Sequence, residues 1–208
     1  ISLAWGIIGA LFFLAASLLV YDQIGSWNIS ELSHMKDSPF VTATIFLFLV
    51  GLLMKLAIVP FHVWMPSVHA EHPTCIAGLL AVYANLAVYV LIRVVVLPLG
   101  SEFQQFGMPL MVLALVTMVY GSLLTMAQTD IKRLAACSTI SQIAYSVLGL
   151  AALTSSSVQG GMFFFLSHIM GKTVFFSTAG IVVYATGVRD MRQMGGLARR
   201  MPVTAALW

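Results

Sequence analysis

Apolar runs of about 20 residues recur along the whole chain and are separated by short polar turns. A helix of that length crosses the hydrocarbon layer of a bilayer. Only a helix satisfies its own backbone there, and the strict alternation of a membrane β-strand is absent. We therefore predict an all-α transmembrane bundle with six spans and the start of a seventh near Pro202. The six spans are expected at Ser2–Tyr21, Phe40–Pro66, Thr74–Leu97, Gly107–Ala127, Arg133–Leu153 and Gly160–Ala185.

The composition excludes a globular domain in water. Only 8% of the 208 residues are charged and 60% are hydrophobic, whereas a soluble domain carries about 25% charged residues. We predict an integral, multi-pass membrane protein with the lipid bilayer as its solvent. The chain begins and ends inside apolar runs, so we interpret residues 1–208 as one fragment of a longer transporter domain.

Nothing in the sequence indicates a cofactor, a metal or a nucleic acid as partner. The two cysteines, Cys75 and Cys137, lack CxxC spacing. His69, Glu71 and His72 share one turn, but no further ligand follows them. With no glycine-rich phosphate loop either, we predict a chain without a redox or catalytic site of its own.

Positive charges indicate the orientation of the bundle. Lys132 and Arg133 lie between the fourth and fifth runs, and the arginines of the 189–200 segment follow the sixth. These two loops fall on the same side, together with the turn at residues 69–72. The positive-inside rule places residues Arg189–Arg200 in the cytoplasm, and we interpret these basic residues as anchors at helix ends.

The second run contains a lysine near its middle and a proline shortly after it. Lys55 is the only charged residue between Phe40 and Pro60, and placing it in hydrocarbon costs at least ~2.5–3.5 kcal/mol. We expect Pro60 and Pro66 to bracket a helix break, because proline lacks a backbone donor and clashes with the preceding turn. A charge beside such a break predicts an ion pathway. His62, inside the break, either bonds a freed carbonyl or carries protons.

The sixth run contains a second lysine, about twelve residues from either end and too deep to reach the headgroups easily. His168 and Lys172 are four residues apart, so they share one face of a helix. Imidazole exchanges protons near neutral pH, and a desolvated lysine releases its proton more readily. The pair therefore predicts two steps of a proton relay. The alternative is a snorkelling lysine with a histidine bonded to a carbonyl.

Two further sets of polar residues need an explanation inside an apolar chain. Asn85 in the third run is interpreted mainly as packing between helices. Ser138, Ser141 and Gln142 recur at helical spacing in the fifth run. That face holds either a chain of waters or polar packing against the broken helix, and the sequence favours neither.

Four collinear blocks resemble a known family. The block 55–66, followed by His69-Ala70-Glu71, is similar to the broken-helix signature of the antiporter-like subunits of NADH–quinone oxidoreductase (complex I). The blocks 130–142, 168–176 and 187–202 resemble the signatures that come next in that family. The likeness is closest to the M-type subunit, then to the D-type subunit of multisubunit sodium/proton antiporters. Membrane-bound hydrogenases contain relatives.

The resemblance implies a fragment of a larger bundle built from two inverted repeats. It implies that Lys55 belongs to a first half-channel and that His168 and Lys172 link it to a second. The acidic partner of Lys55 and the terminal charged residue are expected outside residues 1–208. Asn85 and Gln142 depart from the family, since many members have a lysine and a histidine at these positions.

We therefore expect a non-redox subunit that translocates protons in a NADH/quinone oxidoreductase-type complex, beside other membrane subunits. It would lie in the plasma membrane of a prokaryote or an equivalent energy-transducing membrane. The first alternative is a subunit of a sodium/proton antiporter or a membrane-bound hydrogenase, with sodium in place of the proton. The second alternative is a structural subunit without conduction.

Overall fold

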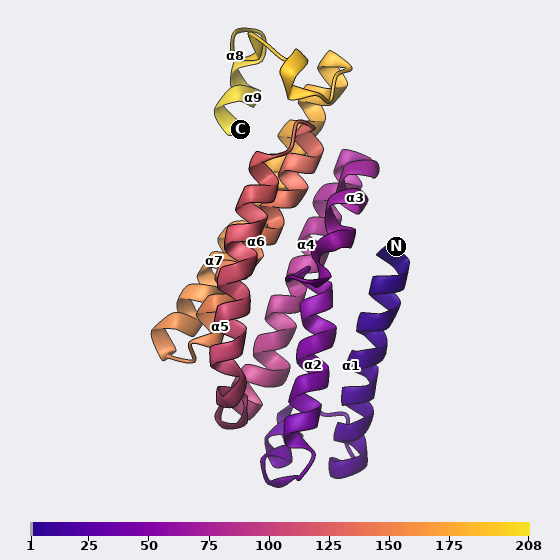
Figure 1. The fold of residues 1–208 in the computed structure, drawn as a ribbon, viewed down its shortest axis with the longest axis vertical. Coiled ribbons are helices and arrows are strands. Elements are labelled where there is room, and N and C mark those ends of the chain that lie inside the picture. Colours follow the sequence, from indigo (N-terminus) through magenta and orange to yellow (C-terminus); the bar gives the residue numbers. More distant parts are fainter. Residues whose placement is uncertain (1) are drawn as a thin grey trace.

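Long helices run up and down the molecule in the computed structural model, which describes residues 2–208 apart from the side chains of Ser2 and Cys75 (Figure 1). No strand occurs within this described part, so the expected all-α architecture is confirmed. The long helices are α1 (Ser2–Ile24), α2 (Val41–Lys55), α4 (Thr74–Leu91), α5 (Leu97–Met126), α6 (Ile131–Ala151) and α7 (Ser155–Thr186). The short ones are η1 (Ile29–Asp37), η2 (Phe61–Val63), α3 (Trp64–Glu71), η3 (Ile92–Val96), η4 (Met191–Gln193), α8 (Leu197–Arg200) and α9 (Pro202–Leu207).

Four helical stretches are long and apolar enough to cross a membrane, and α2 is a shorter apolar helix. One of the four, Ile76–Met126, covers nearly all of the third and the fourth expected spans. The turn expected between Leu97 and Gly107 lies at Leu99, and the residues that follow it are already helical. A π-helical turn, η3, joins α4 to α5, and Leu99 departs from helical geometry at φ −121° and ψ 26°. The chain reverses its direction there (Figure 1).

Local sequence signals set where α6 and α7 begin and end. Asp130 caps α6, because its carboxylate accepts from the amides of Lys132 at 2.8 Å and Arg133 at 3.1 Å. Thr154 and Ser157 form a reciprocal capping box at the start of α7. Gly187 ends α7 at φ +69°, a conformation that glycine adopts without a steric cost.

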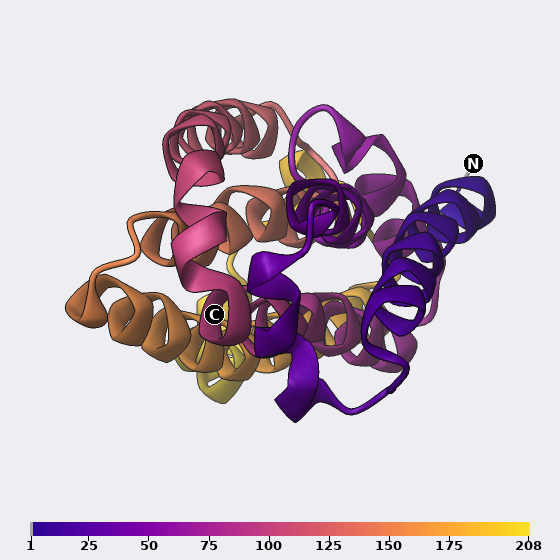
Figure 2. The ribbon, with the colours of Figure 1, turned by 90° about the horizontal axis from the view of Figure 1, so that it is seen from below.

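Close helix contacts depend on small residues. A Cβ on Gly121 of α5 would lie 2.7 Å from the backbone nitrogen of Ser141 in α6. Only glycine allows the two backbones to approach so closely. Seen from the end of the bundle, α1 lies at one edge and α7 on the opposite side (Figure 2). The outward residues of α1, such as Leu3 and Leu11, are exposed and apolar, as expected of a surface in lipid or against other helices.

Candidate functional site

The helix that carries Lys55 ends at that residue. The chain is then non-helical from Leu56 to Pro60, where Ala57 takes a left-handed φ of +53°. The break thus starts earlier than the sequence indicates. Pro66, which we expected to close the break, is in the first turn of α3. Backbone amides in the first turn of a helix have no intrahelical acceptor, so a proline is tolerated there.

Side chains from neighbouring segments satisfy the backbone groups that the break frees. The amide of Val59 donates to Thr117 Oγ1 of α5 at 3.2 Å, and Trp64 Nε1 donates to the carbonyl of Met54 at 3.1 Å. Leu56 is fully buried, as is Thr117. Ala57 and Ile58 are fully buried as well, so this first part of the break faces other helices, which is the condition for irregular backbone at membrane depth. Thr117 carries no sequence signal of this role, because a threonine in an apolar helix ordinarily bonds its own backbone.

Lys55 lies at the carboxyl end of α2, where a cation is favourable against the helix dipole. Its Nζ is 3.9 Å from the centroid of the Tyr83 ring of α4, a cation–π contact. No carboxylate pairs with it in the described part of the chain. His62 contacts Tyr120 of α5, with 3.3 Å between His62 Nε2 and the phenol oxygen, rather than a freed carbonyl.

Lys172 points into the bundle. Only 6% of its surface is exposed, and its Nζ donates to the carbonyl of Ala135 at 2.9 Å and to Ser138 Oγ. Both acceptors belong to α6. The side chain thus points toward the polar residues of the fifth run, and the snorkelling alternative is wrong.

An open cavity of about 610 Å³ between α6, α7 and α9 contains four of the predicted relay or water-holding residues. Its lining includes Ser138, Gln142, His168 and Lys172. His168 is 9% exposed, and its Nε2 is buried without a hydrogen-bond partner among the described residues. The cavity therefore brings a buried amine, an imidazole, a hydroxyl and an amide to one place.

Two predicted polar residues lie elsewhere. Ser141 faces α5, where it packs against Gly121, and its hydroxyl donates to the carbonyl of Ser138 at 3.1 Å. Helical spacing predicts that Ser141 shares one face with Ser138 and Gln142. In the structure, Ser138 and Gln142 line the cavity, but Ser141 does not. Asn85 is 1% exposed, and its amide nitrogen donates to the carbonyl of Ala81 at 2.7 Å.

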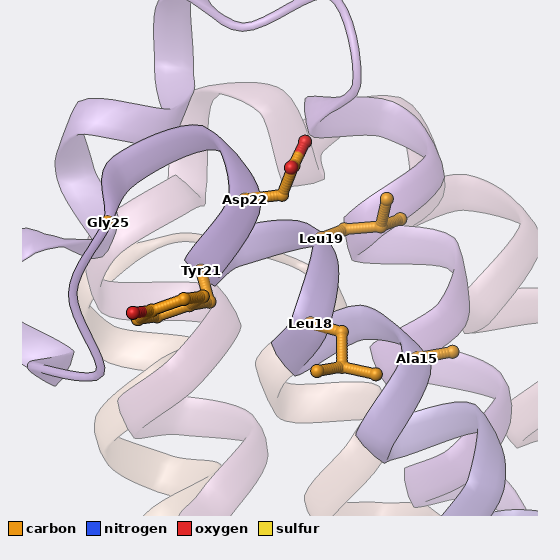
Figure 3. Close-up of a pocket in the computed structure, with 6 residues that line it drawn as sticks. All are labelled: Ala15, Leu18, Leu19, Tyr21, Asp22 and Gly25. Atoms are coloured by element: carbon orange, nitrogen blue, oxygen red, sulfur yellow. The ribbon is translucent and has the colours of Figure 1, made fainter.

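A second hollow, of about 870 Å³, lies near the carboxyl end of α1 (Figure 3). It is lined by Ala15, Leu18, Leu19, Tyr21, Asp22 and Gly25. None of these is a predicted relay residue, and the hollow lies on α1, at one edge of the bundle (Figure 2).

Comparison with known families identifies this arrangement. The family described as "NADH:quinone oxidoreductase/Mrp antiporter, TM" matches residues 1–208. The chain belongs to this family. The expected resemblance to antiporter-like membrane subunits is confirmed, and the chain is a membrane-embedded member of that group.

Two curated relatives are named as subunits of a quinone oxidoreductase and of a dehydrogenase. NADH-quinone oxidoreductase subunit M from Rickettsia conorii is 28% identical over 204 residues, which are 96% of this chain and 41% of the relative. F(420)H(2) dehydrogenase subunit M from Methanosarcina mazei is 35% identical over 186 residues, or 88% of this chain and 36% of the relative. The chain thus spans about two fifths of the length of the curated relatives that it matches.

Solved structures show the same fold. The structure of respiratory complex I from Thermus thermophilus with bound NADH contains a chain similar to this one, with a TM-score of 0.90 and 25% identity. The match covers 99% of this chain and 45% of that one. The Mrp complex from Dietzia sp. gives a TM-score of 0.91 at 24% identity, over 97% of this chain and 38% of that one, and supports the fold alone. The described residues are therefore a fragment of the antiporter-like fold.

Proposed function

We propose that this chain is the part of a non-redox membrane subunit that carries protons in a NADH–quinone oxidoreductase-type complex. The observation that carries the proposal is the cavity in which Lys172, His168 and Ser138 meet, beside the middle of α7. A buried lysine is expensive in lipid, so its presence beside His168 and Ser138 argues for a transport role. We also propose that the Arg189–Arg200 segment lies on the cytoplasmic side, as the positive-inside rule predicts.

The partners of Lys172 suit a group that changes its protonation state. The carbonyl of Ala135 and the hydroxyl of Ser138 both accept from the ammonium form. Since a serine hydroxyl also donates, it can turn to the neutral amine after the proton has left. Like charges on Lys172 and His168 repel, so simultaneous protonation of both is disfavoured. The buried Nε2 of His168 provides the next acceptor for a proton or a water molecule.

Helix α4 lies on the path between the two lysines. Lys55 contacts α4 at Tyr83, and Ala81 of the same helix lies in one buried cluster with Phe176 of α7. Asn85, one turn from Ala81, is therefore on the side of α4 that faces α6 and α7. An asparagine does not carry a proton as a lysine does, so we infer that it orients water between Lys55 and Lys172.

The test uses the assembled complex, containing the full subunit, in sealed membrane vesicles. Lys172→Met removes the amine but keeps an unbranched side chain, and we expect a large loss of protons translocated per electron with normal assembly. Lys36→Met is the matched control, because Lys36 is an exposed lysine of η1, outside the cavity. A normal proton yield in Lys172→Met would overturn the proposal and favour a structural subunit.

A sodium/proton antiporter subunit remains the second candidate, since the family covers both kinds of complex. The same vesicles separate the two. Proton uptake that requires the electron donor supports the first function, whereas sodium-dependent proton movement driven by an imposed gradient alone supports the second.

A further inference from the structure

Lys132 and Arg189 hold the end of the broken helix. Lys132, which the sequence places among the cytoplasmic anchors, is only 8% exposed. Its Nζ donates to the carbonyl of His72 at 2.8 Å and to that of Ala70 at 3.4 Å. Arg189 Nη2 donates to the same Ala70 carbonyl at 2.8 Å. We call these two cations and two carbonyls the carbonyl clamp.

The carbonyl clamp joins three segments that are far apart in the sequence. The ion pair between Arg189 Nε and the Asp130 carboxylate, at 3.1 Å, fixes the arginine. The backbone of Ile131 donates to the carbonyl of Arg189 at 3.1 Å, and that of Met191 to the carbonyl of Thr129 at 2.9 Å. All of these segments lie at one end of the bundle (Figure 1).

The carbonyls in the clamp are those that a helix end leaves without partners. Ala70 is in the last turn of α3, and His72 follows its end. Carbonyls at this position lack intrahelical donors, and they lie at the negative end of the helix dipole. Lys132 and Arg189 supply the missing hydrogen-bond donors, and their positive charges are favourable at the negative end of the dipole. The clamp therefore fixes α3 at its carboxyl end.

Helix α3 connects the two lysine sites. At its amino end, Trp64 bonds the carbonyl of Met54, next to Lys55. At its carboxyl end, the clamp attaches it to the first turn of α6. One turn along α6 is Ala135, whose carbonyl accepts from Lys172. A shift of α3 relative to α6 would thus change the distance between the surroundings of Lys55 and the acceptors of Lys172.

We propose that Lys132 and Arg189 are positioning residues for ion translocation, which hold α3 in the register that the relay requires. Neither residue lines the Lys172 cavity. The proposal rests on the proposed function for its effect on transport, but its effect on α3 is independent of the transported ion.

The test compares four variants of the assembled complex by hydrogen–deuterium exchange of residues 64–72 and by protons translocated per electron. Lys132→Met should speed exchange in this segment by about tenfold or more, because a charged hydrogen bond is lost, and should lower the proton yield. Lys132→Arg keeps a cation with several donors and should restore both. Arg133→Met is the matched control, since Arg133 is about half exposed and makes only a 3.9 Å ion pair with Glu71.

Arg189→Gln repeats the test from the other cation and is expected to act like Lys132→Met. Unchanged hydrogen exchange in both Lys132→Met and Arg189→Gln overturns the proposal. Faster exchange in these variants with a wild-type proton yield also overturns it. An equal effect of Arg133→Met, or loss of assembly in both clamp variants, makes the role merely structural and also overturns it. If the clamp variants exchange faster but the wild-type complex itself translocates no protons, then the proposed function is wrong and the role of the clamp in fixing α3 is not.

Discussion

Replacing Thr117 by valine tests how the non-helical segment after Lys55 is stabilised inside the bundle. The substitution keeps the shape of the side chain but removes the hydroxyl that accepts from the amide of Val59. Thr117 is fully buried, so no water replaces it directly. A buried donor without a partner costs ~1–3 kcal/mol. We expect local unfolding of residues 56–60 to become about 5- to 150-fold more frequent, since 1.4 kcal/mol corresponds to a factor of ten.

The assay is hydrogen exchange of residues 56–60 in the assembled complex, together with proton yield. Thr125→Val is the matched control on the same helix, because Thr125 Oγ1 donates only to the carbonyl of Gly121, at 2.7 Å, four residues back. Thr117 makes the same kind of bond to Leu113, at 2.7 Å. The difference between the two variants therefore isolates the contact with Val59. Equal exchange in both variants would refute this account of the break.

Three further predictions concern the lysine sites and the packing. Lys55→Ala should leave the complex assembled but abolish most proton pumping, and Lys55→Arg should also impair it, because arginine effectively never releases its proton; normal proton-to-electron stoichiometry in both would contradict this. Lys172→Met should reduce pumping more than His168→Gln, since glutamine can still hold a water molecule, and the reverse order would argue against Lys172 as the main carrier. Gly121→Ala should destabilise the subunit by ~1–3 kcal/mol, because its methyl group would lie 2.7 Å from the backbone of Ser141, and an unchanged thermal midpoint would show that the helices separate freely.

The length and polarity of the runs determined the spans, because crossing a bilayer is a local requirement on about 20 residues. The same reasoning located Lys55 and Lys172, since a charge deep in an apolar run is costly wherever the helices pack. The helix break beside Lys55 followed from Pro60, because a missing donor acts on its own segment. The family followed from the blocks around these residues, and it matches the whole chain.

The tertiary structure decided which polar residues meet. Ser138 and Ser141 are three positions apart on α6, yet one bonds Lys172 and the other packs against α5. The rotation of α6 between its neighbours makes this choice, and helical spacing alone does not contain it. Thr117 is 58 residues from Val59 in the sequence. The sequence predicts that Lys132 is an anchor at a helix end, but the side chain is buried against the end of α3. Contacts between distant segments depend on packing of the whole bundle, so no local pattern of residues encodes them.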